Sequence, residues 1–243
     1  MKYLITVLVL CLPKFGNSQG LFLIEDQVTA DGTKVSALFI KTTNDFDEAI
    51  GNFKKYAKDE HDLKVKKDNS TTYMIEMVDL PHLSVKRGDL YTYLYKTDSA
   101  NIMAFSFRLG YDISINSEEY PEEMAEFKKF ITGYMEYHYH THYMNLIDDQ
   151  SKIMDQAVKE LRQNENKISS LQKKASSLDK KYQKETDEDK KSEITSEKAT
   201  LEREAEMLTQ KLPEQRQNVS DLEDVISILK KELNGYHQEI SSL

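Results

Sequence analysis

The residues best suited to chemistry lie in a run rich in histidine and tyrosine. His138 and His142 are four residues apart, so on an α-helix they share one face. Two imidazoles at this spacing can hold one metal ion, and Asn145 and Asp149 continue the same face. His138 and His142 are therefore the candidate metal ligands of the sequence. The glutamate that metalloproteases place between two such histidines is absent, because Tyr139 follows His138.

Two other interpretations explain the same run. An amphipathic helix at a domain border would bury the rings of His and Tyr and keep their polar atoms in water. A pair of histidines on a helix surface would respond to pH in the physiological range. Of the three interpretations, we expect the amphipathic helix.

A row of tyrosines is the second candidate feature. Tyr91, Tyr93 and Tyr95 occupy alternate positions, as the residues on one face of a strand do. They could line a pocket for an apolar ligand, although such a row more often packs a sheet face against a helix. The neighbourhood of Phe39, Tyr93 and Phe107 should separate the two interpretations. An empty cavity there favours a ligand carrier, and a filled core favours a scaffold.

The sequence contains no motif of an enzyme active site. It has only 8 glycines and shows no phosphate-binding loop, nucleophile elbow or pair of catalytic carboxylates. Cys11 is the single cysteine, which leaves the rest of the chain without disulfides or thiolate metal sites. The acidic stretch from Glu185 to Asp189 lacks the alternating ligands and glycine of a calcium loop. We therefore predict that the protein is not an enzyme and uses no cofactor.

The N-terminus resembles a secretory signal peptide, residues 1–18. Lys2 supplies the positive charge, and Tyr3 to Leu12 supply an apolar core too short to span a bilayer. Small residues precede a cleavage site between Ser18 and Gln19. A lipid anchor and an uncleaved anchor are the alternatives. We expect an exported protein, periplasmic or secreted.

Composition narrows the range of partners. A formal net charge of −9 argues against nucleic acid and against an anionic membrane surface after signal cleavage. A charged fraction of 31% and a mean hydropathy of −0.65 are typical of long solvated helices. The glycosylation sequons at Asn69 and Asn218 matter only in a host that glycosylates exported proteins.

The first half of the chain predicts an antiparallel sheet. The expected strands are Phe22 to Ala30, Thr33 to Lys41, Leu63 to Lys66, Thr72 to Val78, Leu90 to Lys96 and Ile102 to Leu109. Asp31-Gly32 predicts a two-residue hairpin turn, and Asp45 followed by Glu48 predicts the start of a short helix. Its apolar stripe consists of Phe46, Ile50, Phe53 and Ala57.

The second half predicts long helices. An unbroken helix is expected from about Pro121 to Tyr182. One face of this helix should cover the sheet, and that face consists of Met124, Phe127, Ile131, Tyr134 and His138. Heptad repeats then predict a coiled coil. The first frame holds Ile147, Met154, Leu161, Ile168, Ala175 and Tyr182, with Ala157, Leu171 and Leu178 three residues on. The second holds Ala205, Leu212, Val219, Ile226, Leu233 and Ile240, together with Ile194, Leu201, Leu208, Leu222, Leu229 and Tyr236.

The heptad register breaks between the two blocks, which predicts the tip of a hairpin. Thr186 followed by acidic residues is typical of an N-cap, so the second helix should begin there and return. The alternative is one long helix that dimerises in parallel. Pro213 should kink the second helix or split it.

The predicted fold is α+β, an N-terminal antiparallel β-sheet domain with a short helix, followed by a long helix that leads into an antiparallel coiled-coil helical hairpin. The predicted domains are 19–115 and 116–243, with the hairpin tip near 185–189. We expect a non-enzymatic interaction or scaffold protein that contacts a protein partner through the coiled coil; self-association is left open. The alternative function is a helix-grip-like binding module for an apolar small molecule or lipid.

Overall fold

The computed structural model describes residues 20–30, 32–43, 45–78, 87–97, 100–110 and 113–243. Its elements are β1 (Leu23–Ala30), β2 (Thr33–Thr42), α1 (Phe46–His61), β3 (Lys66–Lys67), β4 (Thr72–Val78), β5 (Gly88–Lys96), β6 (Asn101–Arg108), α2 (Pro121–Tyr182) and α3 (Glu188–Ile240). The predicted signal segment lies outside the described residues, so it stays a prediction. Within those ranges no helix has the length and apolar character needed to cross a bilayer.

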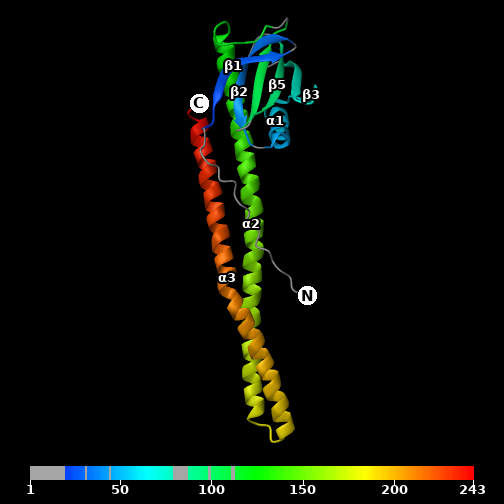
Figure 1. Cartoon of the computed structure of the whole chain (residues 1–243), viewed down its shortest axis with the longest axis vertical. Helices are drawn as coiled ribbons and strands as arrows, with labels where there is room; N and C mark the ends of the chain where they lie inside the picture. Colours follow the sequence, from blue (N-terminus) through cyan, green and yellow to red (C-terminus); the bar gives the residue numbers. More distant parts are fainter. Residues whose placement is uncertain (1–19, 31, 44, 79–86, 98–99, 111–112) are drawn as a thin grey trace. The chain divides into compact units, whose positions relative to one another are not determined.

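The six strands form one antiparallel sheet in the order β1-β2-β6-β5-β4-β3 (Figure 1). Only two residues separate β1 from β2, and Gly32 takes a positive φ of 80° there, which glycine adopts without steric cost. Its neighbour in the predicted turn, Asp31, lies outside the described residues. The sheet and the two long helices packed on each other confirm the predicted fold class.

Local signals explain how α1 begins and ends. The Asp45 side chain accepts hydrogen bonds from the backbone N–H groups of Asp47 and Glu48, which is the predicted N-cap. At the other end Asp62 is left-handed, with φ 54°, and the Leu63 N–H donates to the Ala57 carbonyl.

This C-terminal cap corrects the prediction of a strand from Leu63 to Lys66. The backbone of Leu63 closes the helix and is not available to a β-ladder. The observed strand β3 is therefore only Lys66–Lys67.

One face of the sheet is covered by α1 and by the first part of α2. The Phe53 ring of α1 packs against the Phe105 ring of β6 and the Tyr134 ring of α2, with centroid distances of 5.2 Å and 5.1 Å. The Tyr134 hydroxyl donates to the Ala49 carbonyl at 2.9 Å, which satisfies its buried polar atom. Side chains exposed by less than 2% fill this layer: Tyr134, Phe53, Phe105, Phe107, Phe127, Leu38, Ile40, Leu90, Met103, Ile115 and Met124.

Gly133 allows α1 and α2 to approach closely. A Cβ atom at Gly133 would lie 2.6 Å from the hydroxyl oxygen of Tyr56. That hydroxyl donates to the carbonyl of Phe130 at 3.0 Å, so any larger residue at position 133 would displace the Tyr56 side chain from this hydrogen bond. The glycine costs some helix propensity, and the close packing compensates for it.

Glu25 links β1 to the segment that precedes α2. Its carboxylate accepts from the Ser117 backbone N–H at 2.8 Å and from the Ser36 hydroxyl at 3.2 Å, and the Lys128 ammonium is 3.9 Å away. Burial raises the pKa of Glu25, but these hydrogen bonds and the lysine charge together hold it below the ordinary value. The ionised carboxylate thereby fixes where the chain turns into α2.

The opposite face of the sheet carries the tyrosine row. Phe39 and Tyr93 both pair with Ala104, so the three share this face. Phe107 is three residues from Ala104 and points to the helix side. The sequence-based grouping of Phe39, Tyr93 and Phe107 was therefore wrong, because the sheet separates them.

Two compact units divide the chain. The first comprises the chain up to Tyr137 together with Tyr236–Leu243, and the second is His138–Gly235. The predicted domain boundary at residue 115 concerns independent folding and stays a prediction. In the second unit α2 and α3 form the hairpin, and α3 continues through Pro213 without being split.

Candidate functional sites

His138 is fully buried, whereas His142 is half-buried on the same face of α2. Burial, together with the neighbouring His142, lowers the pKa of His138 to about 4. The His138 ring makes an edge contact with Tyr139 at 5.2 Å, and the His142 ring makes one with Tyr143 at 5.3 Å. His138 is therefore neutral at physiological pH.

A third metal ligand is not provided by the residues that the sequence placed on this face. Asn145 and Asp149 are both exposed, unlike His138. In the part of the chain that the structure describes, no three His, Cys, Asp or Glu side chains gather in a metal-binding group. Metal binding by the pair His138 and His142 stays a prediction, and the geometry offers it no added ligand.

The tyrosine face contains a buried cation. The Arg108 guanidinium donates to the Tyr93 hydroxyl at 2.5 Å and lies over the Tyr91 ring at 4.2 Å. Burial raises the pKa of Tyr93 to about 12, despite the opposing charge of Arg108. Small residues of β2 and β6, Ala37 and Ala104, give the tyrosine rings room to pack. This arrangement is a second small core on the sheet.

The heptad seam accounts for the packing of the hairpin. Of the predicted seam residues of α2, only Tyr182 is exposed, at 44%. All twelve predicted seam residues of the second frame are buried or half-buried. The seams therefore bury each other within one chain, as the hairpin prediction requires.

Three ion pairs cross the hairpin beside the seam. They join Lys167 to Glu204 at 2.6 Å, Glu165 to Arg216 at 2.9 Å, and Asp179 to Lys198 at 2.6 Å. As the residue number on α2 rises from 165 to 179, the number of its partner on α3 falls from 216 to 198, so the two helices are antiparallel. Each exposed pair contributes little stability, but together they favour this pairing. The alternative of a straight helix that dimerises in parallel is wrong.

A polar layer interrupts the apolar seam at matched positions. Asn164 and Gln215 fall where each heptad frame skips an apolar residue, and the Asn164 amide donates to the Gln215 carbonyl oxygen at 3.0 Å. A polar pair in a seam fixes register, because any slip leaves both groups without a partner. The gap in each heptad frame was the sequence signal for this pair.

A double-mutant cycle should reveal the register function of this layer. Asn164→Leu or Gln215→Leu alone should lower the free energy of unfolding by about 1 kcal/mol, because the remaining amide loses its partner. The double substitution should recover that loss by forming an apolar layer. Thermal unfolding followed by circular dichroism measures all four proteins. Additive losses in the double variant would contradict the paired role.

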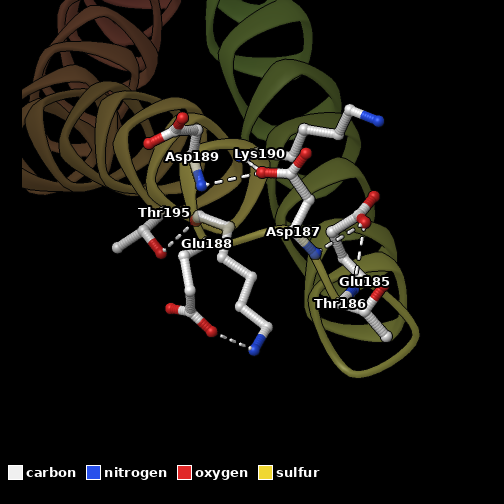
Figure 2. A network of polar contacts seen from close by, with 8 residues as sticks. Glu185, Thr186, Asp187, Glu188, Asp189, Lys190 and Thr195 are labelled. Carbon is white, nitrogen blue, oxygen red and sulfur yellow. Dashed lines mark hydrogen bonds and ion pairs between the residues drawn. The ribbon is translucent and has the colours of Figure 1, made fainter.

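At the hairpin tip, acidic side chains accept hydrogen bonds from nearby backbone N–H groups (Figure 2). Glu185 accepts from the N–H groups of Thr186 and Asp187, and these bonds lower its pKa, led by the bond from Asp187. Asp187 accepts from the N–H of Asp189 at 3.0 Å, so Asp187, not the predicted Thr186, is the N-cap of α3. Asp187 is the better N-cap of the two because its charged carboxylate also interacts favourably with the positive end of the helix dipole.

Each unit has an open hollow lined by described residues. The first, about 380 Å³, lies between the start of β1, the first part of α2 and the C-terminal end of α3, and is lined by Leu23, Thr132, Gly133 and Ile240 among others. The second, about 430 Å³, lies along the hairpin where Ala175 faces the stretch of α3 that holds Ala205. Both are surface grooves without an enclosed apolar chamber.

Comparison of the chain with protein-family models, curated proteins and solved structures found no match.

Proposed function

We propose that the protein is a non-enzymatic interaction or scaffold protein that works outside the cytoplasm and contacts a protein partner through its helical hairpin. The α+β unit is its structural base. The observation that carries the proposal is the hairpin itself, in which α2 and α3, of 62 and 53 residues, pack against each other along one seam beyond the part of α2 that covers the sheet. Such helices expose far more side chains than they bury, which suits them to contact a partner.

The filled core beneath α1 and α2 supports a scaffold over a helix-grip carrier. A carrier needs an apolar cavity of about 300 Å³ or more between its sheet and its helices. Phe53, Phe105 and Tyr134 interlock in that layer, and each is exposed by less than 2%. The carrier therefore receives no support from this side of the sheet.

Photo-cross-linking of the full-length protein in its host tests the proposal. A photoreactive amino acid replaces the exposed residues Gln156, Lys173 and Glu206 of the hairpin, one at a time. The matched controls carry it at the exposed Gln27 and Lys55 of the first unit. We expect one discrete protein adduct from hairpin positions, identified by mass spectrometry, and none from the controls. Adducts confined to the first unit, or absent from every position, would reject the proposed function.

A further inference from the structure

Apolar side chains are exposed on the hairpin at positions that the seam does not use. Leu146 and Ile153 of α2 are 37% and 49% exposed, and Ile228 of α3 is 48% exposed. Removing leucine and isoleucine side chains from water lowers the free energy, so three such exposed residues in one part of a hairpin call for an explanation.

Heptad spacing places these residues on one face. Leu146 and Ile153 belong to a stripe of α2 that reaches Lys167 at intervals of seven, and Lys167 pairs with Glu204 across the hairpin. On α3 the stripe that starts at Glu204 reaches Val225 at the same intervals. Ile228 follows Val225 by three residues and so shares its face.

The same contacts place the two stripes opposite each other. Ile153 on α2 and the turn of α3 that holds Val225 both lie about three helical turns from the Asn164–Gln215 hydrogen bond, in the direction away from the hairpin tip. The apolar patch is defined here as the exposed residues Leu146, Ile153 and Ile228 with the half-buried Ala157, Leu222 and Val225.

The apolar stripe of α2 is wider at this patch than its pairing with α3 requires. A two-stranded coiled coil needs apolar residues only at the two seam positions, whereas a helix in a bundle has a wider stripe that includes a flanking position. Near Ile153, α2 has the wider stripe, although α3 covers only the seam. A further helix laid along the patch would complete a bundle layer.

The charges around the patch decide what kind of helix fits. Four acidic residues border it: Asp149, Glu160, Asp221 and Glu232. Asp149 forms an ion pair with Lys152 at 3.3 Å. Glu160 and Asp221 accept hydrogen bonds from the neutral side chains of Gln156 and Gln217, which leaves their charges in place. A second copy would bring the same acidic border against this one, and like charges repel. A basic border on the partner attracts.

We propose that the apolar patch binds an amphipathic α-helix of a partner protein that carries an apolar stripe flanked by lysine or arginine. The inference rests on the proposed function and names the class of partner. Apolar side chains of that helix enter the space beside Ile153 and Ile228, and its basic residues pair with the acidic border. The affinity therefore depends on apolar contact, and the association rate on charge.

A synthetic helix tests this inference on the full chain. The probe is a peptide of about 21 residues with leucine on one face and lysine on both flanks. A second peptide has glutamate in place of lysine, and a third has serine in place of leucine. Binding is measured by fluorescence anisotropy at two salt concentrations. We expect only the first peptide to bind, and its affinity to fall as salt rises.

Matched variants locate the binding to the patch. Ile153→Glu with Ile228→Glu should weaken binding of the lysine peptide by about tenfold or more. The control pair, Met144→Glu with Val158→Glu, adds the same charge at residues 44% and 43% exposed on the other flank of the seam, and should change the affinity less than about twofold. Circular dichroism confirms that both pairs keep their helices.

The opposite results reject the inference. Equal loss in both pairs of variants would show that only the net charge of −9 attracts the peptide. A wild-type dimer in sedimentation experiments that Ile153→Glu with Ile228→Glu dissociates would assign the patch to a second copy. If hairpin cross-links to a partner persist while these variants leave them unchanged, the proposed function stands and the patch assignment fails.

Discussion

Phe53→Ala should lower the free energy of unfolding by about 3–5 kcal/mol, the range measured for buried aromatic truncations. Phe53 is completely buried and its ring touches Phe105 of β6 and Tyr134 of α2. The substitution opens a cavity where three elements meet, and neighbouring rings held by the sheet cannot collapse into it. The edge-to-face contacts with both rings are lost in addition.

Chemical denaturation followed by circular dichroism and tyrosine fluorescence measures this loss, since the chain has no tryptophan. Phe46→Ala is the matched control, because Phe46 lies on the same helix but is only half-buried. It should cost about 1–2 kcal/mol, in proportion to the smaller area removed from contact. Equal costs for the two variants would show that Phe53 does not join the helices to the sheet.

Local sequence patterns were sufficient to predict the elements of the fold. The alternation around Tyr93 predicted β5, and the cap at Asp45 predicted the start of α1, because both depend on residues close in sequence. The predicted helix from Pro121 to Tyr182 matches α2 at both ends. Its boundaries follow from a proline at the first turn and from the loss of heptad register at the tip.

Features that depend on contacts distant in sequence could not be predicted. Alternation shows that Phe39 and Phe107 each lie on a face, but only the strand order decides whether they share it. The pairing of β2 and β5 with β6 puts Phe39 with Tyr93 and leaves Phe107 against α2. The short β3 likewise depends on the cap that Leu63 makes with Ala57.

The candidate sites could be predicted only in part, because burial and pairing also depend on contacts distant in sequence. As helix neighbours His138 and His142 are equivalent in the sequence, but burial distinguishes them. The polar layer at Asn164 and Gln215 was detectable as a gap in the heptads, although its pairing required the antiparallel alignment. The apolar patch was not predicted, because Ile153 and Ile228 fall outside both heptad frames.

Acidification from pH 7 to pH 4 should remove up to about 3 kcal/mol of stability through His138 alone. The folded pKa of His138 is about 4, and its unfolded value is 6.5. At pH 7 the ring is neutral in both states and contributes nothing to the pH dependence. Between pH 6.5 and pH 4 the unfolded ring takes up a proton and the folded ring does not. Stability therefore falls as the pH falls, and the loss levels off below pH 4.

Comparison with His138→Gln isolates this contribution, since glutamine is polar and does not titrate. Urea unfolding of both proteins is measured from pH 7 to pH 4, and the difference between them cancels the carboxylates that also titrate below pH 5. The variant should lose less stability on acidification than the wild type. His140→Gln is the matched control, because it removes an exposed histidine of the same helix and leaves the buried His138 in place. Parallel curves for wild type and His138→Gln would mean that the buried ring accepts a proton at its ordinary pKa, and that water or a counter-charge reaches it in the folded protein.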